Sequence, residues 1–492
     1  MSGHILAIDQ GTTSTRALIF DPARRVVAKA QQEFAQYYPD DGWVEHDAEM
    51  IWRDVLATTT AALAQSGLAA GDIAAIGITN QRETVVLWDR ATGAPLHRAI
   101  VWQDRRTAQL CAELHAAGHE PMVQARTGLL LDPYFSATKL AWLLDTIPGA
   151  RDRAEMGELA FGTIDCFLLW RLTEGRSHKT DITNASRTLL FDIERQRWCP
   201  DLLAQFRIPA AVLPQVCDSA AAFGVTHLLG AAIPICGMAG DQQAALVGQS
   251  CLAPGQAKIT YGTGGFMLLN TGAVLTRSQS RLLTTVAYRI DGTTHYAMEG
   301  SLFVAGAAIT WLRDGLGIIV EARQTQEMAA NLPNNGGVYM VPAFVGLGAP
   351  HWCTEARGML TGLTFASGPA HIARAALESV AFQTADLVAA MAADGAGRLA
   401  ALRVDGGMAA NDWFCQFLAD ILDIGVERPA NLETTALGAA MLAGHASGAW
   451  PDALTVGPTE AGITRFTSNM TADDRARLFG EWRAAIRRAM LA

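Results

Sequence analysis

Residue types suited to phosphate binding stand together near the start of the chain. An apolar run at 5–8 leads to Asp9, whose carboxylate can hold Mg²⁺ directly or through water. Gly11 permits a tight bend, after which backbone N–H groups and hydroxyls can converge on phosphate oxygens, and Arg16 adds a fixed positive charge. The hydroxyls are those of Thr12, Thr13 and Ser14. Taken alone, the stretch predicts either a phosphate clamp or a β-hairpin with an ordinary polar turn.

Two later glycine clusters have a related pattern. Residues 262–265 and residues 406–411, which end at Asn411, each follow a strand-like run. A glycine turn there lets the backbone approach a ligand closely. We expect the first cluster to contact phosphates and the second to pass beside a nucleoside, although each alone is more often a simple tight turn. The sequence contains neither G-x-x-x-x-G-K-[ST] nor G-x-G-x-x-G, which argues against a phosphate-loop NTPase and a dinucleotide dehydrogenase.

Two further places could serve an alcohol substrate. Asp241 follows the strand-like run 233–240 at the start of a helix, which fits a helix cap, a general base that removes a hydroxyl proton, or both at once. Arg82 and Glu83 lie between two apolar strands, which predicts either a solvated turn or a polyol site. In a polyol site Arg82 would donate to substrate hydroxyls and Glu83 would accept from them.

Length and composition limit the class of protein. The 492 residues exceed the roughly 250 to 300 at which a single core stops growing, so two domains are expected. The net charge of −10 argues against nucleic acid or an anionic membrane as the main partner, because both require a concentrated basic face. No apolar run reaches the ~18 residues of a membrane span, and Asp9 comes too early for a secretory signal, so we expect a cytoplasmic protein. The eight cysteines form no C-x-x-C pair, which predicts reduced thiols.

The elements that position these residues alternate in type. Strand-like segments occupy 5–8, 18–20, 74–79 and 84–88. A helix at 48–65, capped by Asp47, lies among them, and such alternation indicates an α/β domain.

The pattern restarts near residue 250. A strand, a Gly/Thr turn and a second strand span 257–269, as at the start of the chain, so we expect two related modules facing each other across a cleft. A last helix over 472–490, capped by Thr471, is expected to dock through Leu478, Trp482 and Ala485.

Motif strings spread over the chain carry a family resemblance. They are Asp9-Gln10-Gly11-Thr12-Thr13-Ser14, Gly42-Trp43-Val44-Glu45-His46, Thr79-Asn80-Gln81-Arg82-Glu83-Thr84, Trp102-Gln103-Asp104-Arg105-Arg106-Thr107, Asp132-Pro133-Tyr134-Phe135-Ser136, Thr183-Asn184-Ala185-Ser186-Arg187-Thr188, Gly240-Asp241-Gln242-Gln243, Tyr261-Gly262-Thr263-Gly264, Gly346-Leu347-Gly348-Ala349-Pro350 and Val404-Asp405-Gly406-Gly407. With them the sequence resembles the FGGY carbohydrate kinases nearly end to end. The Asn-Gln-Arg-Glu and Gly-Asp-Gln-Gln strings resemble the members that phosphorylate glycerol more than the pentulose kinases.

The resemblance implies an α/β fold with two actin-like, ribonuclease H-like ATPase domains flanking a catalytic cleft. The N-terminal domain would span 1–250 and the C-terminal domain 251–492. The implied activity is ATP-dependent phosphorylation of glycerol to sn-glycerol 3-phosphate with release of ADP, in a homodimer or homotetramer. A kinase for another small polyol or ketose, such as erythritol or dihydroxyacetone, is the alternative within the class. An actin-like or chaperone-type ATPase is the alternative outside it, and would not need Arg82, Glu83 and Asp241 around one small pocket.

The resemblance also assigns residues by position. It implies that Asp241 is the base for the terminal hydroxyl and that Asp9 organises Mg²⁺. The implied glycerol-binding residues are Arg82, Glu83, Trp102, Tyr134, Asp241, Gln242 and Phe266. The implied ATP- and ADP-binding residues are Thr12, Thr13, Ser14, Arg16, Thr263, Gly306, Thr310, Gly407 and Asn411. Thr310 stands where the family often has glutamine, which would soften the contact with adenine.

The regulatory segment departs from the family pattern. Some bacterial relatives bind fructose 1,6-bisphosphate through a glycine-rich loop that carries Lys and Arg, whereas residues 229–234 form a shorter segment without a cation. We therefore expect this bisphosphate not to inhibit. Other relatives carry an activating phosphohistidine in the same region, and for His227 a lone surface histidine is the expected interpretation.

Overall fold

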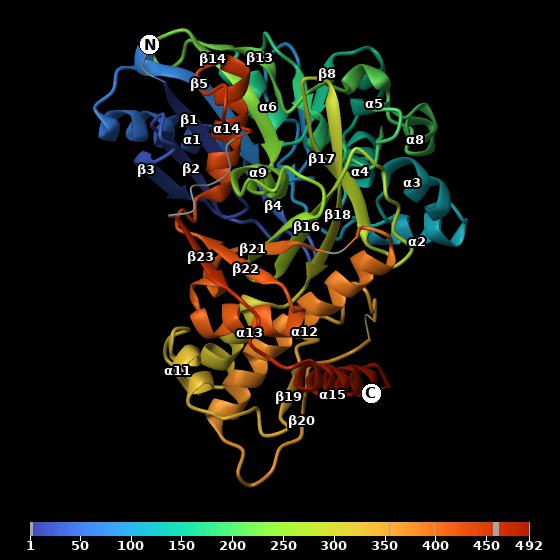
Figure 1. Cartoon of the computed structure of the whole chain (residues 1–492). Helices are drawn as coiled ribbons and strands as arrows, with labels where there is room; N and C mark the ends of the chain where they lie inside the picture. Colours follow the sequence, from blue (N-terminus) through green and yellow to red (C-terminus); the bar gives the residue numbers. More distant parts are fainter. Residues whose placement is uncertain (1–2, 354, 398, 456–461, 492) are drawn as a thin grey trace.

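Two large β-sheets organise the molecule, one from each half of the chain (Figure 1). The computed structural model describes residues 3–353, 355–397, 399–455 and 462–491. The N-terminal sheet has the order β13-β14-β5-β1-β2-β3 and the C-terminal sheet the order β17-β18-β16-β15-β21-β22-β23. The N-terminal strands are β1 His4–Gln10, β2 Ser14–Phe20, β3 Val26–Glu33, β5 Ile73–Asn80, β13 Ala220–Thr226 and β14 Ile233–Gly240. The C-terminal strands are β15 Gln256–Tyr261, β16 Gly265–Gly272, β17 Leu283–Ile290, β18 Thr293–Leu302, β21 Ala401–Asp405, β22 Gly425–Pro429 and β23 Ile463–Phe466.

The two sheets repeat one topology. In the N-terminal sheet β1, β2 and β3 pair antiparallel, β5 and β14 follow in parallel with β1, and β13 closes the edge antiparallel. In the C-terminal sheet β15, β16 and β18 pair antiparallel, β21 and β22 follow in parallel, and β23 closes that edge antiparallel. The expected pair of related modules is confirmed, and only β17 extends beyond the shared pattern.

Helices cover the sheets and fill the space between them. Their bounds are α1 Ala48–Ser66, α2 Ala108–Ala116, α3 Glu120–Thr127, α4 Ser136–Thr146, α5 Ala150–Glu155, α6 Ile164–Leu172, α7 Ile182–Ala185, α8 Pro200–Gln205, α9 Asp241–Gly248, α10 Gly306–Thr310, α11 Gln324–Ala330, α12 Pro369–Ala393, α13 Asp412–Leu422, α14 Thr434–Ser447 and α15 Ala472–Leu491. Asp47 caps α1 as expected, because its Oδ1 accepts from the N–H groups of Glu49 and Met50 at 2.9 and 3.1 Å.

Short paired strands complete the structure. They are β4 Glu45–His46 with β7 Ala99–Ile100, β6 Val86–Asp89 with β8 Leu159–Gly162, β9 Lys179–Asp181 with β12 Gln215–Cys217, β10 Phe191–Asp192 with β11 Arg197–Trp198, and β19 Tyr339–Val341 with β20 Met359–Thr361. The strand expected at 84–88 therefore begins only at Val86.

Helix α14 joins the two halves. It lies late in the chain, yet it packs against β5, β14 and β1 of the N-terminal sheet and against α9; Figure 1 shows it in red among the blue and green strands. The approach to α9 depends on Gly438, where an added Cβ would lie 1.8 Å from the carbonyl oxygen of Ala244. The chain passes from the N-terminal sheet to the C-terminal sheet near residue 250, but α14, which comes later in the chain, packs against the N-terminal sheet. The expected domain boundary at residue 250 therefore stays a prediction.

The last helix and the cysteines match expectation. In α15 the N–H of Asp474 donates to the hydroxyl of Thr471 at 3.2 Å, and Leu478, Trp482 and Ala485 are buried against the C-terminal core. All eight cysteines are free thiols, six of them buried. Among the described residues, no helix combines the length and apolarity that crossing a membrane requires.

Candidate functional site

The first phosphate turn lies at the end of the β1–β2 hairpin. The N–H of Gly11 donates to the carbonyl of Ser14 at 2.9 Å, which closes the turn between the strands. Thr13 is exposed, and Thr12 and Ser14 are partly exposed, so backbone and hydroxyl groups of the turn are accessible. The indole Nε1 of Trp102 donates to the Thr12 hydroxyl at 3.0 Å and helps to hold the turn.

Asp9 and Arg16 form an ion pair beside this turn. Asp9 is only 2% exposed, and burial raises its pKa although Arg16 opposes the rise. Arg16 also donates through Nη1 to Oε2 of Glu433 at 2.7 Å. Oε1 of Glu433 accepts a hydrogen bond from Lys29 Nζ at 2.5 Å. Arg16 is thus shared between carboxylates of the two halves. Glu433 lies 417 residues from Arg16 in the sequence, and no local pattern predicts this contact.

The second phosphate turn, between β15 and β16, is held by the start of α10. Gly262 and Thr263 are exposed, and their carbonyls accept from the N–H groups of Gly306 and Ala305 at 2.9 Å each. An added Cβ on Gly306 would lie 2.5 Å from the carbonyl oxygen of Gly262, so only glycine permits this contact. The structure thereby brings Thr263 and Gly306 together, with Thr310 exposed one helical turn further along α10.

The third glycine turn follows β21 in the C-terminal sheet. Gly407 is exposed in the short helical turn at 407–410, and Asn411 caps α13 by accepting from the N–H of Phe414 at 3.0 Å. Asn411 Nδ2 donates to the hydroxyl of Thr325 at 3.2 Å. Asn411 therefore caps α13 and contacts Thr325, and it does so at the end of the turn that we expect to lie beside a nucleoside.

Arg82 and Glu83 occupy a buried turn after β5, which rules out the solvated-turn interpretation. Their exposed fractions are 3% and 1%. Glu83 has a φ of +61°, a left-handed conformation that costs a non-glycine residue of order 1 kcal/mol and tends to cluster at functional sites. Burial raises the pKa of Glu83, against the opposing effect of Arg187 and Arg82.

Asp241 stands beside this pair. Its Oδ1 lies 3.4 Å from Arg82 Nε, and its side chain remains 32% exposed, so it is open to a ligand. Gly240 is the N-cap of α9 and Asp241 is the first helical residue, where Oδ1 accepts from the N–H of Gln242 at 2.6 Å; the cap interpretation is thus wrong by one residue. Burial raises the pKa of Asp241, while Arg82 and Lys258 lower it.

Three aromatic residues expected as walls lie together and are only partly buried. The ring of Trp102 lies 5.5 Å from that of Tyr134 and 6.4 Å from that of Phe266, edge to face in both cases. Phe266 follows the second phosphate turn and Trp102 bonds to Thr12 of the first, so the aromatic group links both turns. Half-exposed rings fit the apolar face of a small ligand better than a core role.

Several charged residues at this site were not anticipated. Arg187 and Glu299 are buried beside Arg82 and Glu83, and Lys258 is buried beside Gln242, to which its Nζ donates. By alternation, Lys258 shares a strand face with Gln256 and Thr260, and Glu299 shares one with His295 and Ser301. Both therefore fall on the polar face of their strands, and no pattern in the sequence indicated that they would be buried.

The described residues contain no group of three His, Cys, Asp or Glu side chains arranged for a metal ion. Mg²⁺ in phosphoryl-transfer sites is commonly bound by one or two carboxylates together with substrate phosphates and water. A single buried carboxylate at Asp9 beside a hydroxyl-rich turn fits that donor set.

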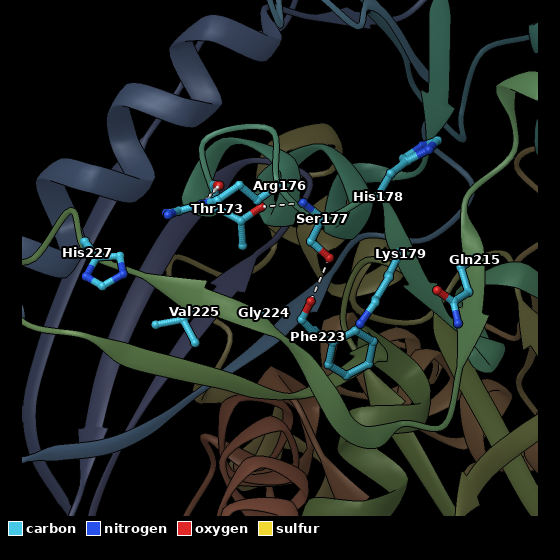
Figure 2. A pocket seen from close by; sticks show the side chains of 10 residues that line it. All are labelled: Thr173, Arg176, Ser177, His178, Lys179, Gln215, Phe223, Gly224, Val225 and His227. Atoms are coloured by element: carbon cyan, nitrogen blue, oxygen red, sulfur yellow. Dashed lines mark hydrogen bonds between the residues drawn. The ribbon is translucent and has the colours of Figure 1, made fainter. Parts of the chain in front are cut away.

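A separate cavity of about 450 Å³ lies away from these residues, at the far edge of the N-terminal sheet (Figure 2). It is bordered by His227, which is exposed, as expected for a surface histidine. Two of its cations already have partners: Arg176 bonds to Glu174 at 2.7 Å and Lys179 to the carbonyl of Ala222 at 2.9 Å.

Comparison with known proteins gives a consistent result over the whole chain. The N-terminal domain model of the FGGY family of carbohydrate kinases matches residues 4–248, and its C-terminal domain model matches residues 257–447. A protein of Rhodospirillum centenum named glycerol kinase is 61% identical over 98% of this chain and 97% of its own. Glycerol kinase 1 of Pseudomonas aeruginosa is 59% identical over 99% of both.

Solved structures agree with this. The structure of Plasmodium falciparum glycerol kinase with ADP superposes with a TM-score of 0.93 at 36% identity, covering 99% of this chain and 98% of that one. Xylulose kinase from Rhodospirillum rubrum shares the fold with a TM-score of 0.83 at 24% identity, covering 99% of this chain and 100% of its own. The actin-like α/β fold expected from the sequence is confirmed.

Proposed function

Because this chain belongs to the FGGY family of carbohydrate kinases, we propose that it transfers the γ-phosphoryl group of ATP to a terminal hydroxyl of glycerol. The products are sn-glycerol 3-phosphate and ADP. The proposal is supported by relatives at about 60% identity over almost the whole chain that are named glycerol kinase. Its main structural support is the position of Arg82 Nε between the carboxylates of Glu83 and Asp241, at 3.8 and 3.4 Å.

The substrate would lie among these polar groups and the aromatic residues. Arg82 donates to glycerol hydroxyls, Glu83 accepts from them, and Gln242 adds an amide. Trp102, Tyr134 and Phe266 contact the C–H faces. Asp241 accepts the proton of the attacking hydroxyl, a role that is suited to a carboxylate with a raised pKa and an open side.

The nucleotide would lie between the two phosphate turns. Phosphoryl transfer depends chiefly on in-line positioning and on neutralising the phosphate oxygens. The residues proposed for this are Thr12, Thr13, Ser14, Arg16, Thr263, Gly306, Thr310, Gly407 and Asn411. Mg²⁺ would be held by Asp9 and would neutralise phosphate charge when bound. Arg16 donates to Asp9 and Glu433 through its two Nη atoms, and because a guanidinium has five N–H donors, a contact with phosphate can add to these bonds or replace one of them.

The test is ADP release by the purified protein with Mg·ATP, with and without glycerol. We expect turnover to depend on glycerol and to yield sn-glycerol 3-phosphate. ATP turnover that ignores glycerol would instead indicate an actin-type ATPase. Faster turnover on erythritol or dihydroxyacetone would favour another kinase of the family. The expected homodimer or homotetramer stays a prediction, which light scattering can test.

A further inference from the structure

One row of the C-terminal sheet carries two buried charges that face the N-terminal half. Lys258 on β15 is paired with Leu268 on β16, and Leu268 with Glu299 on β18. Directly opposed residues of antiparallel strands point to the same face of the sheet. Leu268 packs in a core cluster with Ala244 of α9, so this face is turned toward the elements that carry the expected substrate residues. In Figure 1, β17 and β18 run from the C-terminal sheet into the upper half of the molecule.

The carboxylate of Glu299 accepts hydrogen bonds from both terminal nitrogens of Arg82. Arg82 Nη1 donates to Glu299 Oε2 at 2.6 Å, and Nη2 donates to Oε1 at 2.9 Å. The same Oε1 accepts from Arg187 Nη2 at 3.0 Å, and Arg187 donates through Nε to Oε1 of Glu83 at 2.6 Å. An ion pair between Arg82 Nε and Glu83 Oε1 at 3.8 Å closes a ring in which two carboxylates and two guanidinium groups alternate, and all four side chains are at most 3% exposed.

The ring sets the orientation of Arg82. With its Nη atoms directed at Glu299, the guanidinium presents its Nε edge to Glu83 and Asp241. Rotation of the group would break the paired bonds to Glu299. Oε1 of Gln243 on α9 also accepts from Arg82 Nη1, at 3.3 Å, so Glu299 of the C-terminal sheet and Gln243 together determine which donors Arg82 offers at the substrate position.

Lys258 acts at the other end of the row. Its Nζ donates to Oε1 of Gln242 and to the hydroxyl of Thr260, the latter at 3.0 Å. The bond from Lys258 fixes the amide oxygen of Gln242 on the side of Lys258, so the NH₂ group is directed away from Lys258 and can donate to a ligand. The cation and the anion of one row therefore hold Gln242, which follows Asp241 in the chain, and Arg82, which contacts Asp241.

A purely stabilising role explains this arrangement poorly. Buried ion pairs repay the cost of desolvation incompletely, and well-packed apolar residues of similar volume often serve stability as well or better. A planar bidentate pair between Arg and Glu does, however, fix geometry tightly.

We propose that Glu299 and Lys258 are positioning residues of the substrate site, through which the C-terminal sheet orients Arg82, Glu83 and Gln242 for glycerol. This inference rests on the proposed function. Neither residue contacts the substrate in this scheme, but both hold side chains of the glycerol site. Their loss should therefore weaken glycerol binding more than ATP binding.

The test uses Glu299→Gln, which keeps shape and removes charge, with Glu299→Asp and Lys258→Met as further variants. Glu378→Gln is the matched control, because Glu378 is also buried in the C-terminal half and paired with an arginine, Arg374 at 2.7 Å, but lies outside the site. We expect the KM for glycerol to rise at least 10-fold in Glu299→Gln and less in Glu299→Asp. The KM for ATP should stay within twofold, and the protection of the fold by glycerol against heating should be lost.

Three outcomes would overturn the inference. They are a glycerol KM within twofold of wild type in Glu299→Gln, equal rises of both KM values, or the same effect in Glu378→Gln. If Glu299→Gln does not fold, Glu299→Asp and Lys258→Met carry the same comparison. A wild-type protein without glycerol-dependent ADP release would contradict the proposed function itself, whereas an active wild type with unaffected variants would contradict only the positioning role.

Discussion

Asp241 Oδ1 lies 3.4 Å from Arg82 Nε, which places a partly exposed carboxylate against a buried cation at the junction of the two sheets. Arg82 stabilises the ionised form of Asp241, while burial disfavours it. A carboxylate balanced in this way can accept a proton and release it again. Asp241 is therefore suited to the role of general base that we propose for it.

Replacing Asp241 with Asn should remove the base and preserve the shape of the site. We expect kcat to fall by about 10² to 10⁴, the usual contribution of a positioned general base. Affinity for ADP, measured by calorimetry, should remain. Near-normal turnover would mean that Asp241 only begins helix α9 and is not the base.

Glu83→Gln should weaken glycerol binding. A hydrogen bond to a charged group contributes about 1.5–3 kcal/mol, which corresponds to a rise of about 10- to 100-fold in the KM for glycerol. Steady-state kinetics at saturating ATP measures this value. The prediction fails if the KM for glycerol is unchanged while the KM for ATP rises.

Gly306→Ala should damage the nucleotide site alone. The new Cβ would press on the carbonyl of Gly262 and displace the second phosphate turn. We expect the KM for ATP to rise about 10-fold or more, the effect of a displacement worth about 1.4 kcal/mol, with little change in the KM for glycerol. Gly425→Ala is the control, because its Cβ would meet no atom within 4 Å. Equal effects of the two substitutions would refute the assignment.

Asp9→Asn should increase the Mg²⁺ concentration needed for activity. An amide oxygen is a weaker ligand for a hard cation than a carboxylate. Titration of Mg²⁺ at fixed ATP should give a half-maximal concentration raised about 10-fold, a loss of about 1.4 kcal/mol in binding. EDTA should abolish turnover of the wild type, and an unchanged Mg²⁺ requirement in Asp9→Asn would place the ion elsewhere.

Asp165 should make stability depend on pH. Burial raises the pKa of this carboxyl to about 7 from its ordinary 3.8, although the hydroxyls of Thr163 and Thr180 oppose the rise. Since the folded pKa is the higher one, the contribution of Asp165 to stability is complete below about pH 4 and is lost as the pH rises through about 7.

Asp165→Asn imitates the protonated form and should remove this loss. Thermal unfolding should show a Tm above that of wild type already at pH 5, and this excess should grow by about 2 °C or more between pH 5 and pH 8. A difference that does not grow between these two pH values would contradict the assignment.

The sequence was sufficient to predict an element of the fold wherever the signal for it lay within a few neighbouring residues. The strands before Asp9, before the turn at 262–265 and before Asp405 were predictable, because an apolar run ending in glycine and hydroxyl residues has few other interpretations. The helix cap at Asp47 was equally local.

The partners across the junction were not predictable. Arg82 and Glu299 are separated by 217 residues, and Arg16 and Glu433 by 417. No local pattern specifies a contact at such a distance. Lys258 and Glu299 lie on the polar faces of their strands by alternation, so nothing in the sequence indicated that either would be buried and would need a partner.

The position of α14 has a consequence for how the chain folds. The N-terminal sheet is complete in sequence by Gly240, yet one of its faces is covered by Thr434–Ser447. During synthesis, that face stays uncovered until almost 200 further residues have been made. Contacts between residues this distant in sequence also form slowly. We expect the nascent N-terminal half to expose an apolar surface to chaperones until α14 leaves the ribosome.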